Sequence, residues 1–182
     1  IPPWSNPIEM LEQWARIKPG RPALTGFIGA KQWITRSYCQ LLRRVLAAGR
    51  MISEQPPERL AIACGAHVST VEALFAALAA RREFVLVDLL RKPLSLQLFK
   101  LVDSRATVLV IPALEEMPDQ LVDRINEVKQ GLPQLKIWSF GENAMAELNL
   151  LATGLEGVRL AQIDYPPTAW QDPAALLYSP GR

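Results

Sequence analysis

The sequence predicts an α/β fold in which helices flank a mostly parallel sheet, preceded by an N-terminal helix and a β-hairpin. Five short runs are apolar throughout instead of alternating with polar residues, which is typical of strands buried on both faces. Stretches with helical apolar periodicity separate these runs, as crossovers between parallel strands require. The five expected strands cover residues 60–64, 84–87, 107–111, 135–140 and 174–178.

The N-terminal region does not follow this alternation of strand and helix. Asn6 and Pro7 suit the N-cap and the first position of a helix, and the Lys-Pro-Gly sequence at 18–20 is expected to end it. Residues 22–35 contain two β-prone runs around a glycine-containing turn, which predicts a hairpin.

Two patterns of serine followed by Gln or Glu three positions later predict where crossover helices begin. Ser37 and Gln40 have the spacing of a capping box, in which the two residues satisfy each other's backbone N–H groups. Gly49 is expected to end that helix. Ser69 and Glu72 have the same spacing and predict a second capping box. Further helices are expected to begin at Pro93 and Asp119 and to cover residues 143–151, with a short edge strand at 157–160.

The composition excludes several classes of protein. Hydrophobic residues make up 49% of the chain and charged residues 21%, which is typical of a globular domain. A net charge of +2, with no run of Lys and Arg longer than two, argues against nucleic-acid binding. Cys39 and Cys64 are too few for a four-ligand zinc site, and we expect reduced thiols in a cytoplasmic protein. No apolar run reaches the roughly 18 residues of a membrane span, and residues 1–7 lack the features of a signal peptide.

Ligands of open parallel sheets bind beyond the carboxyl ends of the strands, which selects the candidate site residues. His67 is the single histidine and could titrate near neutral pH, but such a residue is more often hydrogen-bonded to backbone at a helix start. Asp88 either binds a ribose or metal or caps a turn. No glycine-rich loop follows an earlier strand, so dinucleotide binding is a poor interpretation. The strand ends are expected at Gly65, Ala66 and His67, at Asp88, at Pro112, at Gly141 and Glu142, and at Ser179 to Arg182.

The last of these strand ends is the most informative. The expected strand at 174–178 runs into a Ser-Pro-Gly turn at 179–181. A tight turn after a buried strand is a common way for α/β proteins to present backbone N–H groups to a phosphate. Taken alone, this turn is weak evidence for such a site.

Several segments, taken in order, resemble the N-terminal part of the AMP-forming acyl-CoA synthetases and their adenylate-forming relatives. The resemblance extends from about Pro7 to Arg182, and no single segment is specific by itself. The segments are PGRPAL at 19–24, WITRSYCQL at 33–41, RLAI at 59–62 with the helix at 69–80, the stretch from 84 to 111, and DPAALLYS at 172–179.

The resemblance implies an activity and a set of ligands. Such enzymes use Mg-ATP to activate a carboxylic acid as an acyl-adenylate, release pyrophosphate, and pass the acyl group to the thiol of coenzyme A or of an acyl carrier protein. Tyr178, Ser179, Gly181 and Arg182 would begin the loop that binds the ATP phosphates. Residues 1–182 would then be a single partial domain, the N-terminal subdomain, ending at the start of that loop. The resemblance assigns no catalytic or metal-binding residue within them.

The chain departs from the family pattern at the loop itself. Pro180 stands where the family has serine and Arg182 where it has threonine, and proline lacks an N–H donor. Asp88 replaces a family asparagine after an earlier strand. The rest of the loop and the family's catalytic lysine would lie beyond Arg182, so we expect no catalysis and no bound cofactor for residues 1–182 alone.

Two alternatives remain open from the sequence. The chain could belong to a non-catalytic relative that keeps the fold and acts as a binding or assembly module, which Pro180 favours. It could instead be an unrelated flavodoxin-like or receiver-type domain, but residues 64–66 offer no acidic pair for a receiver site. Under the ligase hypothesis, fatty, aromatic and amino acids all remain candidate substrates.

Overall fold

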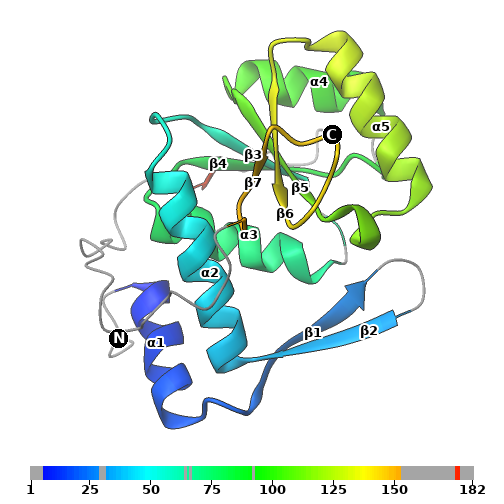
Figure 1. Cartoon of the computed structure of the whole chain (residues 1–182). Helices are drawn as coiled ribbons and strands as arrows, with labels where there is room; N and C mark the ends of the chain where they lie inside the picture. The colour runs from blue at the N-terminus through cyan, green and yellow to red at the C-terminus, as the bar shows by residue number, and fades with distance from the viewer. Residues whose placement is uncertain are drawn as a thin grey trace, which may run out of the picture.

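A computed structural model describes most of the chain and shows an α/β fold built on a parallel sheet (Figure 1). The described residues are 6–28, 32–63, 65, 67–91, 93–152 and 175–176. Within them, six strands pair in the order β7-β6-β5-β3-β4-β8, and every neighbouring pair is parallel. The strands are β3 (Leu60–Ala63), β4 (Phe84–Val87), β5 (Val108–Pro112), β6 (Lys136–Phe140), β7 (Leu148–Asn149) and β8 (Ala175–Leu176).

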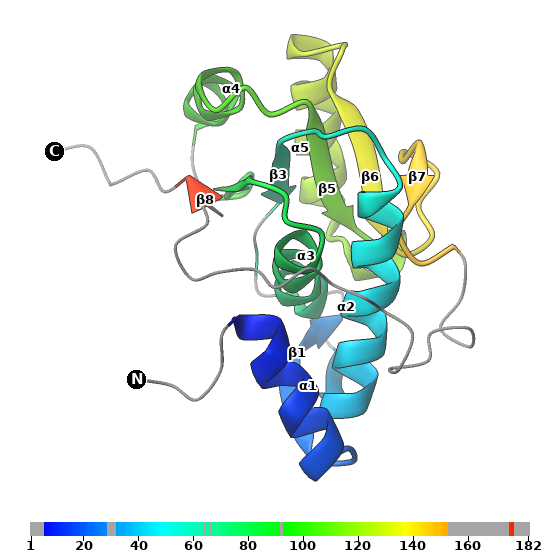
Figure 2. The same cartoon turned by 90° about the vertical axis from the view of Figure 1, so that its left-hand side faces the viewer.

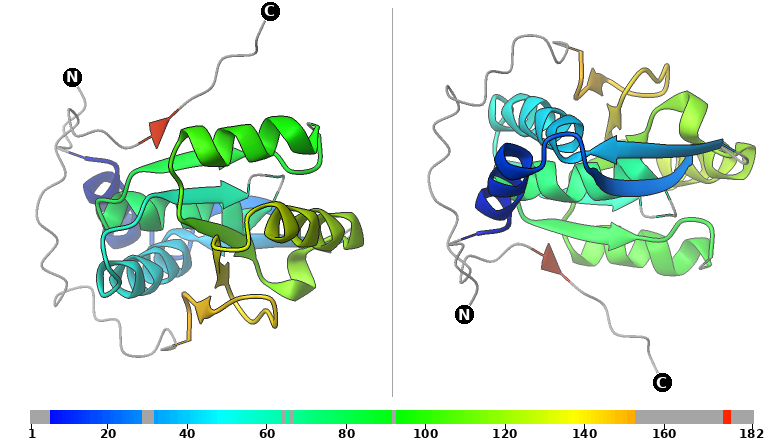
Figure 3. Two further views of the ribbon diagram at one scale, coloured as in Figure 1. Left: turned by 90° about the horizontal axis from the view of Figure 1, so that it is seen from above. Right: turned by 90° about the horizontal axis from the view of Figure 1, so that it is seen from below.

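Two helices cover each face of the sheet, which confirms the predicted fold class. Alternate residues of the same strand face opposite cores: Leu60 and Ile62 of β3 pack with α2 and α3, whereas Ala61 and Ala63 pack with α4 and α5. This arrangement explains why the strands are apolar throughout. Figures 2 and 3 show the two helical layers with the sheet between them. The helices are α2 (Tyr38–Ser53), α3 (Val68–Ala79), α4 (Leu94–Asp103) and α5 (Asp119–Gly131).

The N-terminal elements pack against α2 and α3 instead of extending the sheet. They are α1 (Pro7–Ile17) and the antiparallel strands β1 (Pro22–Ile28) and β2 (Gln32–Ser37), which confirm the expected helix and hairpin. The Asn6 side chain caps α1 by accepting a hydrogen bond from the Glu9 backbone N–H at 2.8 Å. A third core joins the apolar face of α1 to α2 and to Ala79 of α3.

The predicted capping box at the start of α2 is confirmed, but the predicted end of this helix is wrong. Ser37 Oγ accepts from the Gln40 N–H at 3.3 Å, and Gln40 Oε1 accepts from the Ser37 N–H at 2.9 Å. The helix continues through the buried Gly49 to Ser53. One turn beyond Gly49, Ile52 is buried in the core beneath the sheet, and this packing outweighs the weak helix propensity of glycine.

The predicted second capping box is also wrong. Helix α3 begins at Val68, with His67 at the N-cap and no side-chain capping bond. Ser69 lies inside the helix and is buried, and its hydroxyl has no hydrogen-bond partner among the described residues. The Glu72 carboxylate binds two arginines from other elements instead of the helix start. A stronger, charged partner therefore replaces the local capping bond.

Residues 143–151 form turns and the short strand β7 instead of the predicted helix. Two asparagine side chains stabilise the turns: Asn143 Oδ1 accepts from the Met145 N–H at 3.0 Å and Asn149 Oδ1 from the Leu151 N–H at 2.9 Å. Leu148 pairs with Trp138 of β6. The expected strand at 157–160 lies outside the described residues, as does most of the strand expected at 174–178.

The remaining predicted helix starts hold to within a residue. Helix α4 follows Pro93 directly, and Asp119 is the first helical residue of α5 instead of its cap. A 3₁₀ turn, η1 (Leu114–Glu116), connects β5 to α5. None of the described helices combines the length and apolar character needed to cross a membrane.

Candidate functional site

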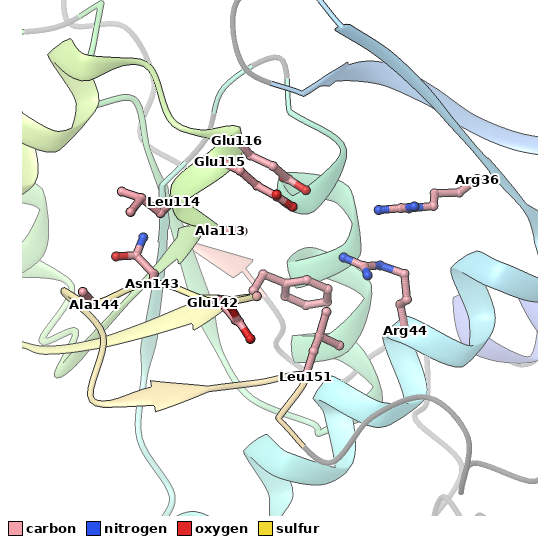
Figure 4. A pocket seen from close by; sticks show the side chains of 12 residues that line it. Arg36, Arg44, Ala113, Leu114, Glu115, Glu116, Glu142, Asn143, Ala144 and Leu151 are labelled. Atoms are coloured by element: carbon pink, nitrogen blue, oxygen red, sulfur yellow. The ribbon is translucent and has the colours of Figure 1, made fainter.

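A cavity of about 580 Å³ opens at the carboxyl ends of β5 and β6, the edge at which ligands of parallel sheets bind. Figure 4 shows two arginines on one side of it and acidic residues of η1 on the other. Phe140 and Leu151 belong to the apolar part of its lining. The polar side chains that line it are Arg36, Arg44, Glu115, Glu116, Glu142 and Asn143.

The cavity is bordered by a buried ion cluster centred on Glu72 of α3. Two of the three guanidinium nitrogens of Arg44 donate to this carboxylate, Nε at 2.6 Å and Nη2 at 2.8 Å, and Arg36 Nε donates to it at 3.2 Å. Glu72 is 0% exposed, and the two arginine side chains are only 14% and 18% exposed. The cluster joins β2, α2 and α3, and it fixes the hairpin to the helical layer.

Glu116 of η1 adds a second buried carboxyl group beside this cluster. It is 3% exposed, and its Oε2 has no hydrogen-bond partner among the described residues. Burial raises the pKa of Glu116, and the nearby negative charge of Glu72 raises it further. The Ser69 hydroxyl and the two arginines lower it. The net shift is upward, so this side chain keeps its proton to a higher pH than an ordinary glutamate does.

Contacts between the β5 and β6 termini hold the rim of the cavity in place. Gly141 has a φ of +136°, and a Cβ there would lie 2.7 Å from the Cβ of Ala113. Only glycine allows this close approach of the two loops. The Leu114 N–H donates to the Glu142 carbonyl at 2.9 Å, and Asn143 Nδ2 donates to the Pro112 carbonyl at 3.1 Å.

The chemistry of this cavity is that of a structural charge cluster more than of a reaction centre. Arg44 already makes a two-pronged hydrogen bond to Glu72, and its guanidinium lies 5.6 Å from the centre of the Phe140 ring. In the described part of the chain, no group of three or more His, Cys, Asp or Glu residues could hold a metal ion. No described side chain here forms a nucleophile and base pair.

The sequence analysis missed the members of this ion cluster. One signal was available for Glu72: it is a charged residue within a helix that is otherwise almost wholly apolar. Such a residue is rarely buried unless it is paired. Its partners Arg36 and Arg44 lie 36 and 28 positions away, and nothing local in the sequence connects them to it.

The structure separates the two interpretations of Asp88 and qualifies that of His67. Asp88 Oδ1 accepts a hydrogen bond from the Arg91 N–H at 3.0 Å, so this residue caps a turn. His67 occupies the N-cap of α3, but its Nδ1 is buried with no partner among the described residues. Burial lowers the pKa of His67, which favours the neutral ring. Its ring also explains Gly65, whose Cβ would lie 2.8 Å from His67 Cδ2.

The four residues predicted to begin the phosphate loop, Tyr178, Ser179, Gly181 and Arg182, lie outside the described residues. The strand before them is described: β8 runs parallel to β4, with Ala175 opposite Phe84 and Leu176 opposite Val85. The chain therefore leaves β8 toward the carboxyl edge of the sheet. In the strand order, β3 and β4 lie between β8 and the strands β5 and β6 that border the cavity.

Comparison with known proteins decides the family. The family model for the AMP-binding enzymes matches residues 11–181, almost the whole chain. The chain belongs to this family. Its fold is that of the N-terminal part of the adenylate-forming enzymes, which confirms the resemblance seen in the sequence. No curated protein sequence matches the chain significantly.

Solved structures of adenylate-forming enzymes share this fold at low sequence identity. An anthranilate CoA ligase in complex with anthranoyl-AMP has a TM-score of 0.67 and 17% identity, over 100% of this chain and 32% of that one. Acetoacetyl-CoA synthetase from Streptomyces lividans has a TM-score of 0.68 and 19% identity, over 94% and 28%. Fatty acyl-adenylate ligase from L. pneumophila, in complex with acyl adenylate and pyrophosphate, has a TM-score of 0.58 and 15% identity, over 85% and 25%. The chain thus spans only a quarter to a third of these structures.

Proposed function

We propose that this chain is the N-terminal portion of an ATP-dependent ligase that activates a carboxylic acid as an acyl-adenylate. The observation that carries the proposal is the extent of the family match, which runs through β8 and to residue 181. The match therefore includes the turn at 179–181 that the sequence singled out as the start of a phosphate loop.

The chemistry of that segment fits the phosphates of ATP. Ser179 offers a hydroxyl, Gly181 a backbone N–H, and Arg182 a guanidinium, and all three donate hydrogen bonds to anionic oxygens. Together with Tyr178 these residues would hold the nucleotide at the carboxyl edge of the sheet, next to β4. The set contains no carboxylate, so Mg²⁺ would be held by the phosphates and by groups outside it.

The second half of the proposed reaction transfers the acyl group to a thiol, that of coenzyme A or of carrier-protein pantetheine. The similar structures include a CoA ligase and a fatty acyl-adenylate ligase, and both acceptors are kept in the proposal. Fatty, aromatic and amino acids are all candidate substrates. Dependence on ATP and a thiol acceptor is consistent with a cytoplasmic location.

The decisive experiment is ATP–pyrophosphate exchange, measured on a chain extended past Arg182 to the length of the similar structures. We expect exchange with at least one acid from a panel of fatty, aromatic and amino acids. Replacing Ser179 by alanine is expected to reduce the exchange rate about 10-fold or more, because one donor to the phosphates is lost. The 182-residue chain is expected to give no exchange and serves as the matched negative control.

A second candidate function is supported by Pro180, which takes the place of a family serine and removes one N–H donor. In that case the fold would serve as a binding or assembly module without catalysis. The extended chain would then bind ATP weakly or not at all and give no exchange with any acid. The Pro180→Ser variant separates the two candidates, because a ligase hindered only by this residue gains exchange activity and a module does not.

A further inference from the structure

We propose that a groove at the amino edge of the sheet binds a small anion that carries two or more phosphate groups. The groove has a volume of about 430 Å³ and lies between the segments that precede β3, β4 and β5. The arrows of β3 and β4 in Figure 3 point away from this edge. It therefore lies at the opposite edge of the sheet from the cavity at the carboxyl ends of β5 and β6.

Arginines from three separate connections meet in this groove. Arg59 precedes β3, Arg81 and Arg82 connect α3 to β4, and Arg105 connects α4 to β5. They are far apart in the sequence, and the parallel crossovers bring them to one edge. Pro57, Glu58 and Glu83 complete the lining.

The two carboxylates of the groove are already paired. Glu83 forms an ion pair with Arg59, and Glu58 forms one with Lys136 and accepts a hydrogen bond from the Thr107 hydroxyl at 3.0 Å. Arg82 and Arg105 form no ion pair among the described residues, so their two positive charges in the groove are not offset there. Two helix C-termini at this edge carry about half a negative charge each, so positive charge remains for a ligand.

The donors of two arginines are not used up by carboxylates. Arg82 Nη2 donates to the neutral Gln55 carbonyl at 2.9 Å, and its Nε is buried without a partner among the described residues. Arg105 is exposed and forms no ion pair within the described part of the chain. Guanidinium groups bind phosphate oxygens in a two-pronged geometry, which selects phosphate over a small halide ion.

The backbone at two of these arginines is unusual. Arg81 and Arg105 have φ values of +54° and +55° and are the non-glycine residues with positive φ in the described chain. Each stands just after a helix, where the following residue donates back into the last turn: Arg82 N–H to Ala77 and Ala106 N–H to Leu101. Glycine is the residue that usually occupies this position.

The presence of arginine at both left-handed positions favours a ligand-binding role over a purely structural one. A cation near a helix C-terminus is favourable, but any lysine or arginine within the last turn supplies that benefit without a left-handed backbone. Both positions instead carry a long cationic side chain where glycine would fit better, and both line the same groove. Strained positions of this kind are found where a side chain is needed at a site.

The size of the groove favours a small molecule over a protein segment. Its volume lies within the roughly 300–1,000 Å³ of small-ligand sites. Because its arginines come from three connections, one phosphate cannot be expected to reach all of them. A diphosphate spans more of the groove, so we expect pyrophosphate to bind at least 10-fold more tightly than inorganic phosphate.

The test is calorimetric titration of the 182-residue chain with inorganic pyrophosphate at low salt. We expect a dissociation constant of about 1 mM or lower, weakened when the ionic strength is raised from about 0.05 M to about 0.5 M. The double variant Arg81→Gly, Arg105→Gly is expected to weaken binding at least 10-fold. Glycine suits both backbones, so this variant should fold, and urea denaturation verifies that it does.

Matched controls separate the groove from the proposed ATP loop and from general charge effects. Arg124→Gln, an arginine on the surface of α5, should leave pyrophosphate binding unchanged. Ser179→Ala reports whether pyrophosphate binds at the loop instead of the groove. A loss caused by Ser179→Ala would place the anion in the loop and overturn the groove proposal while supporting the ATP site. Unchanged binding in the double glycine variant, no binding of pyrophosphate, or binding of hexaglutamate in its place would also overturn it.

Discussion

Removal of the Glu72 charge is expected to destabilise the folded chain more than removal of any exposed carboxylate. The substitution Glu72→Gln keeps the size of the side chain and deletes its charge. Two partly buried guanidinium groups then lose their counter-charge: Arg44, bound at 2.6 and 2.8 Å, and Arg36, bound at 3.2 Å. Each guanidinium group lost water contacts on folding, and the contact with Glu72 offsets that cost.

The expected loss is about 3 kcal/mol of unfolding free energy, the lower end of the roughly 3–5 kcal/mol seen when one partner of a buried ion pair is removed. Glutamine falls at the lower end because its carbonyl can still accept one of the three hydrogen bonds. Domains of this size have about 5–15 kcal/mol in total, so the variant should still fold. Arg44→Gln should cost more than Arg36→Gln, because Arg44 makes two short bonds and Arg36 one long one.

Urea denaturation followed by circular dichroism measures these differences from the transition midpoint at constant slope. The control is Glu127→Gln on α5, which breaks the exposed pair with Arg124 and is expected to cost less than about 1 kcal/mol. A Glu72→Gln variant within about 1 kcal/mol of the parent would refute the reasoning, because the cluster would then contribute no more than a surface pair.

Three further predictions follow from the same structure. Burial raises the pKa of Glu116, so the folded state holds this proton more tightly and loses stability as the pH rises from about 4.5 through the raised pKa. The Glu116→Gln variant should be more stable than the parent across that range and equally stable below it. A difference in urea midpoints that does not depend on pH would contradict this. Gly141→Ala should cost about 1–3 kcal/mol in the same assay because of its φ of +136° and the 2.7 Å contact, whereas Gly20→Ala, which has open space, should change stability by less than about 0.5 kcal/mol. Ser37→Ala should cost about 1 kcal/mol by removing the cap of α2. Ser69→Ala should cost less, because the Ser69 hydroxyl caps no helix; an equal loss in both variants would contradict this.

The two serine patterns show where local sequence reasoning succeeds and where it fails. Both have the capping-box spacing, and at Ser37 the box forms because Gln40 has no competing partner. At Ser69 it does not form, since the helix begins two residues earlier than the box requires and Glu72 binds two arginines. A capping box depends on residues three apart, but its competitors can come from anywhere in the chain.

The candidate site was predictable to a similar extent. The rule that ligands bind at carboxyl strand ends selected Gly141 and Glu142, and both line the cavity. It also selected Asp88, which caps a turn. The phosphate-loop residues from Tyr178 onward stay a prediction. Residue type and position along a strand indicate which residues lie at the ligand-binding edge of the sheet. They do not indicate which of these side chains form hydrogen bonds with each other.

The sequence by itself determined the fold class, the hairpin, most helix starts and the family. These depend on apolar periodicity and on motifs in their order along the chain, both of which are local properties. Only the tertiary structure decided the partners of Glu72 and the meeting of four arginines at the amino edge. Parallel crossovers place residues from distant segments at one edge of the sheet, and charge pairing there is set by distance in space and by burial, neither of which the order of residues reveals.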